Sequence, residues 1–289
     1  MKNNGLIFLN MLDLPPKTLR HVLNAGIDFS QAESFCANEW QRLGLAENEI
    51  KRVEEIKKSG GLPEELRLIE KNNVTVITAL DADYPALLKE INYAPPVLYV
   101  WGNVSVLNEF SLAIIGSRSC TQYGINMACE FARKLSNLGV VVVSGLARGI
   151  DTAAHTGALN NKTVAVLGSG LLNVYPRENK SLVDLITRHG AVISEFPLNT
   201  LPLRENFPRR NRIVSGLAKG VVVVEASLKS GALITANFAL EQNREVFALP
   251  GKPHDIYSEG TNSLIQCGAK LVQNVDDIIA EFNLCVRPN

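Results

Sequence analysis

The sequence predicts an α/β protein with a doubly wound, Rossmann-like, mostly parallel sheet, preceded by a small all-helical domain. From residue 110 onward, short apolar runs alternate with helical patterns. Strands of a parallel sheet are covered on both faces, so they form continuous apolar runs. The first 70 residues lack such runs and are rich in leucine and charge. We therefore expect a helical domain at 1–70, a connector and extension of the sheet domain at 71–109, and a Rossmann-like domain at 110–289.

The N-terminal segment has leucines and charges at helical spacing, as in "EWQRLGLAENEIKRVEEIKKSG". Gly44 and Leu45 mark an expected turn between two helices. Two interpretations stay open: a helix-hairpin-helix module whose turn amides hold a phosphate, or a helical packing domain without a ligand. The glutamates that follow the turn, such as Glu47 and Glu49, weaken the first interpretation because they repel an anion.

The connector contains two strand-like runs, "VTVITA" (74–79) and "PVLYVWG" (96–102), with a proline-containing loop and short helix between them. After residue 110, the expected strands are 112–116, 140–145, 163–168, 191–195, 221–226 and 245–251, with an edge strand near 271–273. The expected helices are 122–138, 150–160, 232–243 and one near 179–189. This alternation predicts helices on both faces of the sheet.

Composition excludes several classes of protein. The 29 basic and 29 acidic residues cancel, which argues against a generally basic nucleic-acid binder but allows a local basic groove. No apolar run approaches the roughly 20 residues of a membrane span, and the N-terminus does not resemble a signal peptide. The five cysteines are scattered, so we expect neither zinc nor a disulfide framework. These features predict a cytoplasmic protein without a membrane partner.

The loops after the strands carry an unusual concentration of glycine and positive charge. In an open α/β sheet, ligands bind outside the carboxyl ends of the strands, so these loops share one edge. The ten cations expected there are Arg118, Arg148, Arg177, Lys180, Arg204, Arg209, Arg210, Arg212, Lys229 and Lys252. Glycines expose backbone amides to an anion, and arginine offers a planar fork for phosphate. Cations spread over six loops favour an extended polyanion, which is a nucleic-acid backbone.

Aromatic side chains among these cations could stack on unpaired bases, and Phe207 and Tyr175 are the candidates. The predicted DNA-binding residues are Gly116, Ser117, Arg118, Gly145, Arg148, Gly168, Gly170, Lys180, Arg204, Phe207, Arg209, Arg210, Asn211 and Lys229. Phosphate contacts carry no sequence information, so we expect binding without sequence preference.

The segment "RRNR" (209–212) concentrates three arginines within four positions. Helical spacing places Arg209 and Arg212 on one face and Arg210 on another. We expect one or two of them to be structural, pairing with Glu225 or capping loops, and the others to face the ligand.

Catalytic and cofactor motifs are weak. Asp151 and His155 lie four residues apart, but we expect Asp151 to cap a helix and His155 to be buried and hydrogen-bonded. The G-x-G of "GSGLLNVYP" (168–176) lacks a third glycine because that position is Asn173. No P-loop and no nucleophile elbow is present. We therefore expect no catalytic residue, no metal and no cofactor.

Several longer motifs follow one another along the chain. They are "IGSR" (115–118), "SGLARGIDTAAHTGAL" (144–159), "VAVLGSGLLNVYPRENK" (164–180), "ISEFP" (193–197), "FPRRNRIVSGLA" (207–218), "VVVVEASLKSGALITANFALEQNREVFALPG" (221–251) and "GTNSLIQCGA" (260–269). Together they resemble the bacterial DNA-processing protein A family (DprA, also called Smf). The resemblance covers about residues 75–273 without a large gap.

This resemblance implies a DNA-binding protein and not an enzyme. Members of the family bind single-stranded DNA in a basic pocket, form homodimers, protect incoming DNA and load the RecA recombinase on it during natural transformation and recombination. The family's pocket positions fall on Arg118, Lys180, Arg204 and Phe207. The resemblance also implies that this chain lacks the further winged-helix-like C-terminal domain of some members.

The alternative is a Rossmann-like nucleotide-binding enzyme, similar to nucleoside-monophosphate phosphoribohydrolases. Those enzymes have a P-G-G-x-G-T signature. The nearest segment here, "LPGKPHD" (249–255), lacks the second glycine and the G-T. Hydrolysis of a purine nucleotide would decide in favour of this alternative.

Overall fold

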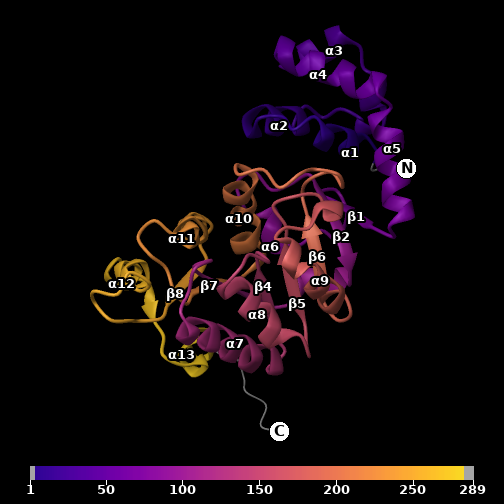
Figure 1. The fold of residues 1–289 in the computed structure, drawn as a ribbon. Coiled ribbons are helices and arrows are strands. Elements are labelled where there is room, and N and C mark those ends of the chain that lie inside the picture. The colour runs from indigo at the N-terminus through magenta and orange to yellow at the C-terminus, as the bar shows by residue number, and fades with distance from the viewer. Residues whose placement is uncertain (1–3, 283–289) are drawn as a thin grey trace.

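A nine-stranded sheet forms the centre of the protein (Figure 1). The computed structural model describes residues 4–282; residues 1–3 and 283–289, including Cys285, lie outside the described part. The strand order is β1-β2-β6-β5-β4-β3-β7-β8-β9. The strands are β1 (Thr75–Thr78), β2 (Val97–Gly102), β3 (Ser111–Ile115), β4 (Val141–Ser144), β5 (Thr163–Val166), β6 (Ala191–Ser194), β7 (Gly220–Val223), β8 (Glu245–Ala248) and β9 (Lys270–Leu271). Strands β3 to β9 pair in parallel, whereas β2 runs antiparallel to both β1 and β6.

Helices cover both faces of the sheet because its central strands are apolar on both sides, as the fully buried β4 shows. One face packs against α6 (Ala86–Lys89), α10 (Asn206–Leu217) and α11 (Gly231–Glu241). The other face packs against α7 (Gln122–Asn137), α8 (Ile150–Ala158) and α13 (Val275–Phe282) toward β7 and β8, and against α9 (Lys180–Ile186) toward β6. The remaining segments are α12 (Glu259–Gln266) and the 3₁₀ turns η2 (Val104–Asn108), η3 (Leu171–Asn173) and η4 (Arg177–Asn179).

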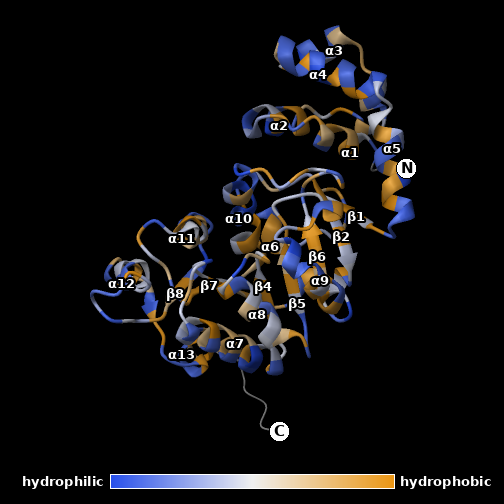
Figure 2. Cartoon of the chain, viewed as in Figure 1, coloured by the Kyte–Doolittle hydropathy of each residue, from blue (hydrophilic) through white to orange (hydrophobic). Residues whose placement is uncertain are grey.

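The N-terminal residues form a helical layer beyond one end of the sheet, with α1 beside the sheet and α3 and α4 farthest from it (Figure 1). Its elements are α1 (Asn4–Met11), α2 (Pro16–Leu23), η1 (Phe29–Ser34), α3 (Ala37–Arg42), α4 (Glu47–Lys58) and α5 (Gly61–Lys71). Figure 2 shows many hydrophilic residues along α3 and α4, whereas α1 is mainly apolar in its middle. Phe8 and Leu9 of α1 share one core cluster with Tyr99 of β2 and Leu198 after β6. The helical layer therefore packs directly on the sheet domain.

Two buried polar contacts join the helical layer to the loop after β6. Asn10 Nδ2 donates to the carbonyl of Glu195 at 2.8 Å, and the backbone N–H of Leu198 donates to Glu65 Oε1 at 2.8 Å. Burial raises the pKa of Glu65, although the Leu198 amide opposes that change. These bonds fix the loop that leads into α10.

The sheet and most expected helices form where the apolar pattern predicts them, so the doubly wound α/β fold is confirmed. The two strand-like runs of the connector become β1 and β2 and extend the same sheet. The turn at Gly44 links α3 and α4, with a left-handed φ of 82°. The expected helices did not include α10, α12 or α13. Within residues 4–282, no helix combines the length and apolarity needed to cross a bilayer.

Candidate nucleic-acid interface

A pocket of about 640 Å³ opens at the carboxyl ends of β3, β4 and β7. The strand order reverses here, because β4 and β7 lie on opposite sides of β3. Such a reversal leaves a crevice between connections that leave the sheet on opposite faces, which is where open α/β sheets bind ligands. The volume lies within the range of about 300–1,000 Å³ that small ligands occupy. The lining residues are 115–119, Gly145, Ala147, Asp151, Tyr175, Pro202, Arg204, Phe207, Pro208, Arg210, Asn211, Val214, 230–232, Ile234 and Thr235.

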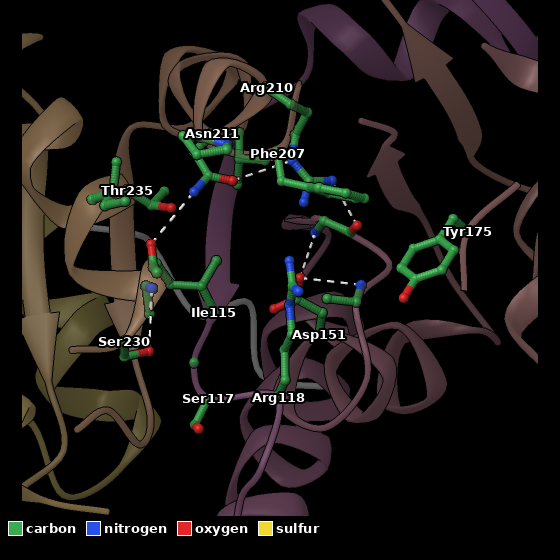
Figure 3. A pocket seen from close by; sticks show the side chains of 18 of the residues that line it. Ile115, Ser117, Arg118, Asp151, Tyr175, Phe207, Arg210, Asn211, Ser230 and Thr235 are labelled. Atoms are coloured by element: carbon green, nitrogen blue, oxygen red, sulfur yellow. Dashed lines mark hydrogen bonds between the residues drawn. The ribbon is translucent and has the colours of Figure 1, made fainter. Parts of the chain in front are cut away.

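An aromatic and cationic group lies on one side of this pocket (Figure 3). The Arg118 guanidinium carbon lies 5.2 Å from the centre of the Phe207 ring, and the Tyr175 ring centre lies 5.6 Å from that of Phe207. Arg118 and Tyr175 are exposed, and no described acidic residue forms an ion pair with Arg118. The cluster therefore offers an uncompensated charge next to flat apolar surfaces, the combination that binds unpaired nucleotides.

The Phe207 ring packs directly against the backbone of Gly168. A Cβ added at Gly168 would lie 2.8 Å from Phe207 Cδ1, closer than packed carbon atoms tolerate. The glycine after β5 is therefore needed for the ring to lie where it does. Gly168 does not line the pocket itself, and acts through Phe207.

Arg210 lines the pocket, but its side chain is almost entirely buried, with 3% of the residue exposed. Its Nη1 donates to the carbonyl of Gly145 at 2.6 Å and to that of Val166, so it ties the ends of β4 and β5 together. Burial lowers the pKa of Arg210 to about 10, although the charge of Asp151 opposes that change. The side chain is therefore still a cation at neutral pH.

Asp151 lies beside Arg210 and accepts hydrogen bonds from the backbone N–H groups of Gly145 (3.2 Å) and Ala147 (3.3 Å). Burial raises the pKa of Asp151, against the charge of Arg210. The expectation that Asp151 caps α8 is wrong, because the N-cap of α8 is Gly149. Asp151 instead holds the loop before the helix. His155 is buried and hydrogen-bonded, as expected.

Arg209 and Arg212 share one face of α10, as their spacing predicts, and that face points away from the pocket. Arg212 binds Glu195 through Nη1–Oε1 (3.0 Å) and Nη2–Oε2 (2.6 Å). Arg209 binds Glu195 (Nη2–Oε2, 3.4 Å) and Asp13 of the helical layer. The expectation that these arginines pair with Glu225 is wrong, because their carboxylate partner after β6 is Glu195. Glu225 instead accepts from the backbone N–H of Thr121 at 2.8 Å, at the start of α7.

The structure brings eight of the predicted residues into the pocket lining: Gly116, Ser117, Arg118, Gly145, Arg204, Phe207, Arg210 and Asn211. The other predicted residues lie outside the lining: Arg148, Gly168, Gly170, Lys180, Arg209 and Lys229. Arg148 pairs with Glu178 at a separate cavity of about 370 Å³. Gly170 packs against the backbone after β6, while Lys180 and Lys229 are exposed on neighbouring segments.

Sequence reasoning missed the residues that begin α11. Ser230, Gly231 and Thr235 line the pocket opposite Tyr175 (Figure 3). A serine followed by a helical pattern, directly after a strand at the reversal point, was the available signal. Among the residues that the structure describes, no cluster of three or more histidine, cysteine or acidic side chains could hold a metal.

Comparison with known proteins adds a family assignment. A family sequence model described as DNA recombination-mediator protein A matches residues 75–283. Protein Smf from Escherichia coli (strain K12) is 48% identical over 214 residues, which are 73% of this chain and 57% of Smf. The chain thus spans little more than half the length of that relative.

Two solved structures resemble most of this chain. The X-ray structure of DNA processing protein A from Streptococcus pneumoniae has a TM-score of 0.85 and 37% identity, covering 97% of this chain and 98% of that one. A structure of DNA processing protein A from Helicobacter pylori, reported for its single-stranded DNA binding mode, has a TM-score of 0.67 and 30% identity. It covers 73% of this chain and 95% of that one.

Proposed function

The chain belongs to the DNA recombination-mediator protein A family, and we propose that it binds single-stranded DNA in the pocket lined by Arg118 and Phe207. The observation that carries the proposal is the group of exposed Arg118, half-buried Phe207 and exposed Tyr175, in which a free guanidinium stands beside two aromatic rings. The single-stranded DNA bound by the Helicobacter pylori relative supports it.

The pocket chemistry suits a single strand better than a duplex. Aromatic rings stack only on bases that are unpaired, and each such contact is worth about 1–3 kcal/mol. The guanidinium groups of Arg118 and Arg204 attract phosphate and do not distinguish one base from another. Buried Arg210 adds positive charge to the pocket lining, although its hydrogen bonds go to backbone carbonyls. Binding is therefore tight, largely indifferent to sequence and sensitive to salt.

The finer roles rest on the family resemblance. We propose that the protein protects incoming DNA, acts as a homodimer and loads the RecA recombinase during natural transformation and recombination in the cytoplasm. We propose no catalytic reaction for the pocket. The DNA-binding role extends to exposed Lys180 and Lys229 outside the lining, which would meet phosphates farther along the strand.

The test is a titration of fluorescent oligo-dT by anisotropy over a salt series. The wild type is compared with Arg118→Ala and with Arg133→Ala, an exposed arginine on α7 outside the pocket. We expect log K to fall with log salt by about 0.7 per phosphate neutralised. Arg118→Ala should weaken binding and flatten the slope by about that amount, while Arg133→Ala should match the wild type.

Two results would overturn the proposal. One is a wild type that does not bind oligo-dT at low salt. The other is equal binding by wild type and Arg118→Ala. In either case, hydrolysis of purine mononucleotides should be assayed next, because the enzymatic alternative would then account better for the pocket.

A further inference from the structure

The first turn of α11 forms the side of the pocket opposite Tyr175 (Figure 3). The helix has 11 residues, and its N-cap is Ser230, whose hydroxyl accepts from the backbone N–H of Ala232 at 3.3 Å. Within the described chain, the backbone N–H of Gly231 has no hydrogen-bond partner. A Cβ added at Gly231 would meet nothing within 4 Å, so this part of the backbone borders open space. A free donor at the positive end of a helix thus faces the cavity.

Thr235 gives a second, independent indication of a ligand. It lies one turn further along α11, lines the pocket and is only 3% exposed. Its hydroxyl has no hydrogen-bond partner among the described residues. A threonine inside a helix ordinarily satisfies its hydroxyl on the carbonyl four residues earlier. Here that carbonyl belongs to Gly231, and it accepts from Asn211 Nδ2 at 3.4 Å instead.

Thr235 Oγ1 has no partner within the described chain but is accessible from the pocket, so an acceptor atom of a ligand there can take its hydrogen. The donors at this end of the pocket are the Gly231 amide and the Thr235 hydroxyl, with the Asn211 amide beside them. The one acidic side chain in the described lining is Asp151, whose carboxylate is already held by the amides of the β4 loop. The chemistry therefore selects a small anion with several acceptor oxygens, which is a phosphate group.

Resting on the proposed function, we infer that the beginning of α11 holds one phosphate of the DNA strand, in a site separate from Arg118. The same cavity then contacts one nucleotide at both ends, with a base on Phe207 and a phosphate at Gly231 and Thr235. This site uses neutral donors and not a charged side chain. Its loss should therefore weaken binding at every salt concentration by the same factor.

The key variant is Thr235→Val, which removes the hydroxyl and keeps the shape, with Thr235→Ser as the variant that keeps a hydroxyl. In the anisotropy titration with oligo-dT, we expect Thr235→Val to bind about 10-fold or more weakly with an unchanged salt slope, since hydrogen bonds to charged groups contribute about 1.5–3 kcal/mol. Thr235→Ser should bind within about threefold of the wild type. The wild type and Arg118→Ala supply the reference affinity and slope.

A second measurement maps the contacted phosphate along the strand. Oligo-dT is prepared with a single neutral methylphosphonate, moved along the strand one position at a time. We expect replacement of the phosphates that the protein contacts to weaken wild-type binding more than replacement of the others. At one of these positions the effect should be smaller in Thr235→Val, because the donor to that phosphate is already gone.

The outcomes separate this inference from the proposed function. A wild type that does not bind oligo-dT overturns both. Normal binding with wild-type affinity in Thr235→Val overturns the phosphate site alone. So does a methylphosphonate series in which every position has the same effect on the wild type. A Thr235→Val variant whose salt slope flattens like that of Arg118→Ala would also contradict it, since that would make Thr235 act through the charged site.

Discussion

Buried His155 should make the protein less stable as the pH falls. The Thr163 hydroxyl donates its one hydrogen to the carbonyl of Val142 at 2.7 Å, so its oxygen must accept from His155 Nδ1, 2.8 Å away. Nδ1 therefore carries a hydrogen, while Nε2 is buried without a partner within the described chain, which disfavours a second proton there. Burial, and then the positive charge of Arg210, lower the pKa of His155 to about 3.

The sign follows from which state binds the proton. Below the ordinary histidine pKa of about 6.5, the unfolded chain takes up a proton that the native ring refuses. The stabilisation by neutral His155 is thus complete above that pH and is lost as the pH falls toward 3. Each pH unit in this window is worth about 1.4 kcal/mol. Between pH 7 and pH 4.5, the unfolding free energy should fall by about 2.5 kcal/mol from this residue alone.

Urea unfolding of wild type and His155→Gln from pH 7 to 4.5 measures this term, because the other titrating groups are common to both proteins. The stability advantage of the wild type over the variant should shrink by about 2.5 kcal/mol across the range. His189→Gln, at an exposed position, controls for the loss of a histidine. A difference between wild type and His155→Gln that stays constant with pH would refute the reasoning.

The remaining predictions concern α10 and its neighbours. Glu195→Gln removes the buried carboxylate that pairs with largely buried Arg212, so urea unfolding should show a loss of about 3–5 kcal/mol. Asp13→Asn, at the exposed end of the same cluster, should lose only about 0.2–1 kcal/mol; equal losses would mean that burial is not the cause. Gly168→Ala should displace the Phe207 ring, because the new Cβ would lie 2.8 Å from it. Oligo-dT affinity should then fall about 10-fold in the anisotropy titration, and an unchanged affinity would contradict the role given to the ring.

Much of the fold could be predicted because it depends on local patterns. Apolar runs such as 140–145 fix buried strands, and parallel strands bring their carboxyl ends to one edge, so the sequence also predicts where ligands bind. The side-chain directions in "RRNR" depend on the rotation of α10 and on a helical layer far away in the sequence. Glu195 and Glu225 both follow strands, and no local pattern tells which one meets the arginines. Thr235 stands out only when its burial and its missing partner are known.

Helix α10 belongs to two parts of the molecule at once. Phe207 and Asn211 project into the pocket, while Arg209 holds Asp13 of the N-terminal layer. One helix thus contacts the proposed DNA site on one side and the N-terminal helical layer on the other. Coupling free energies are reciprocal, so if DNA binding stabilises the position of α10, it also stabilises the docking of the layer. Displacement of the layer would then weaken DNA binding by the same free energy.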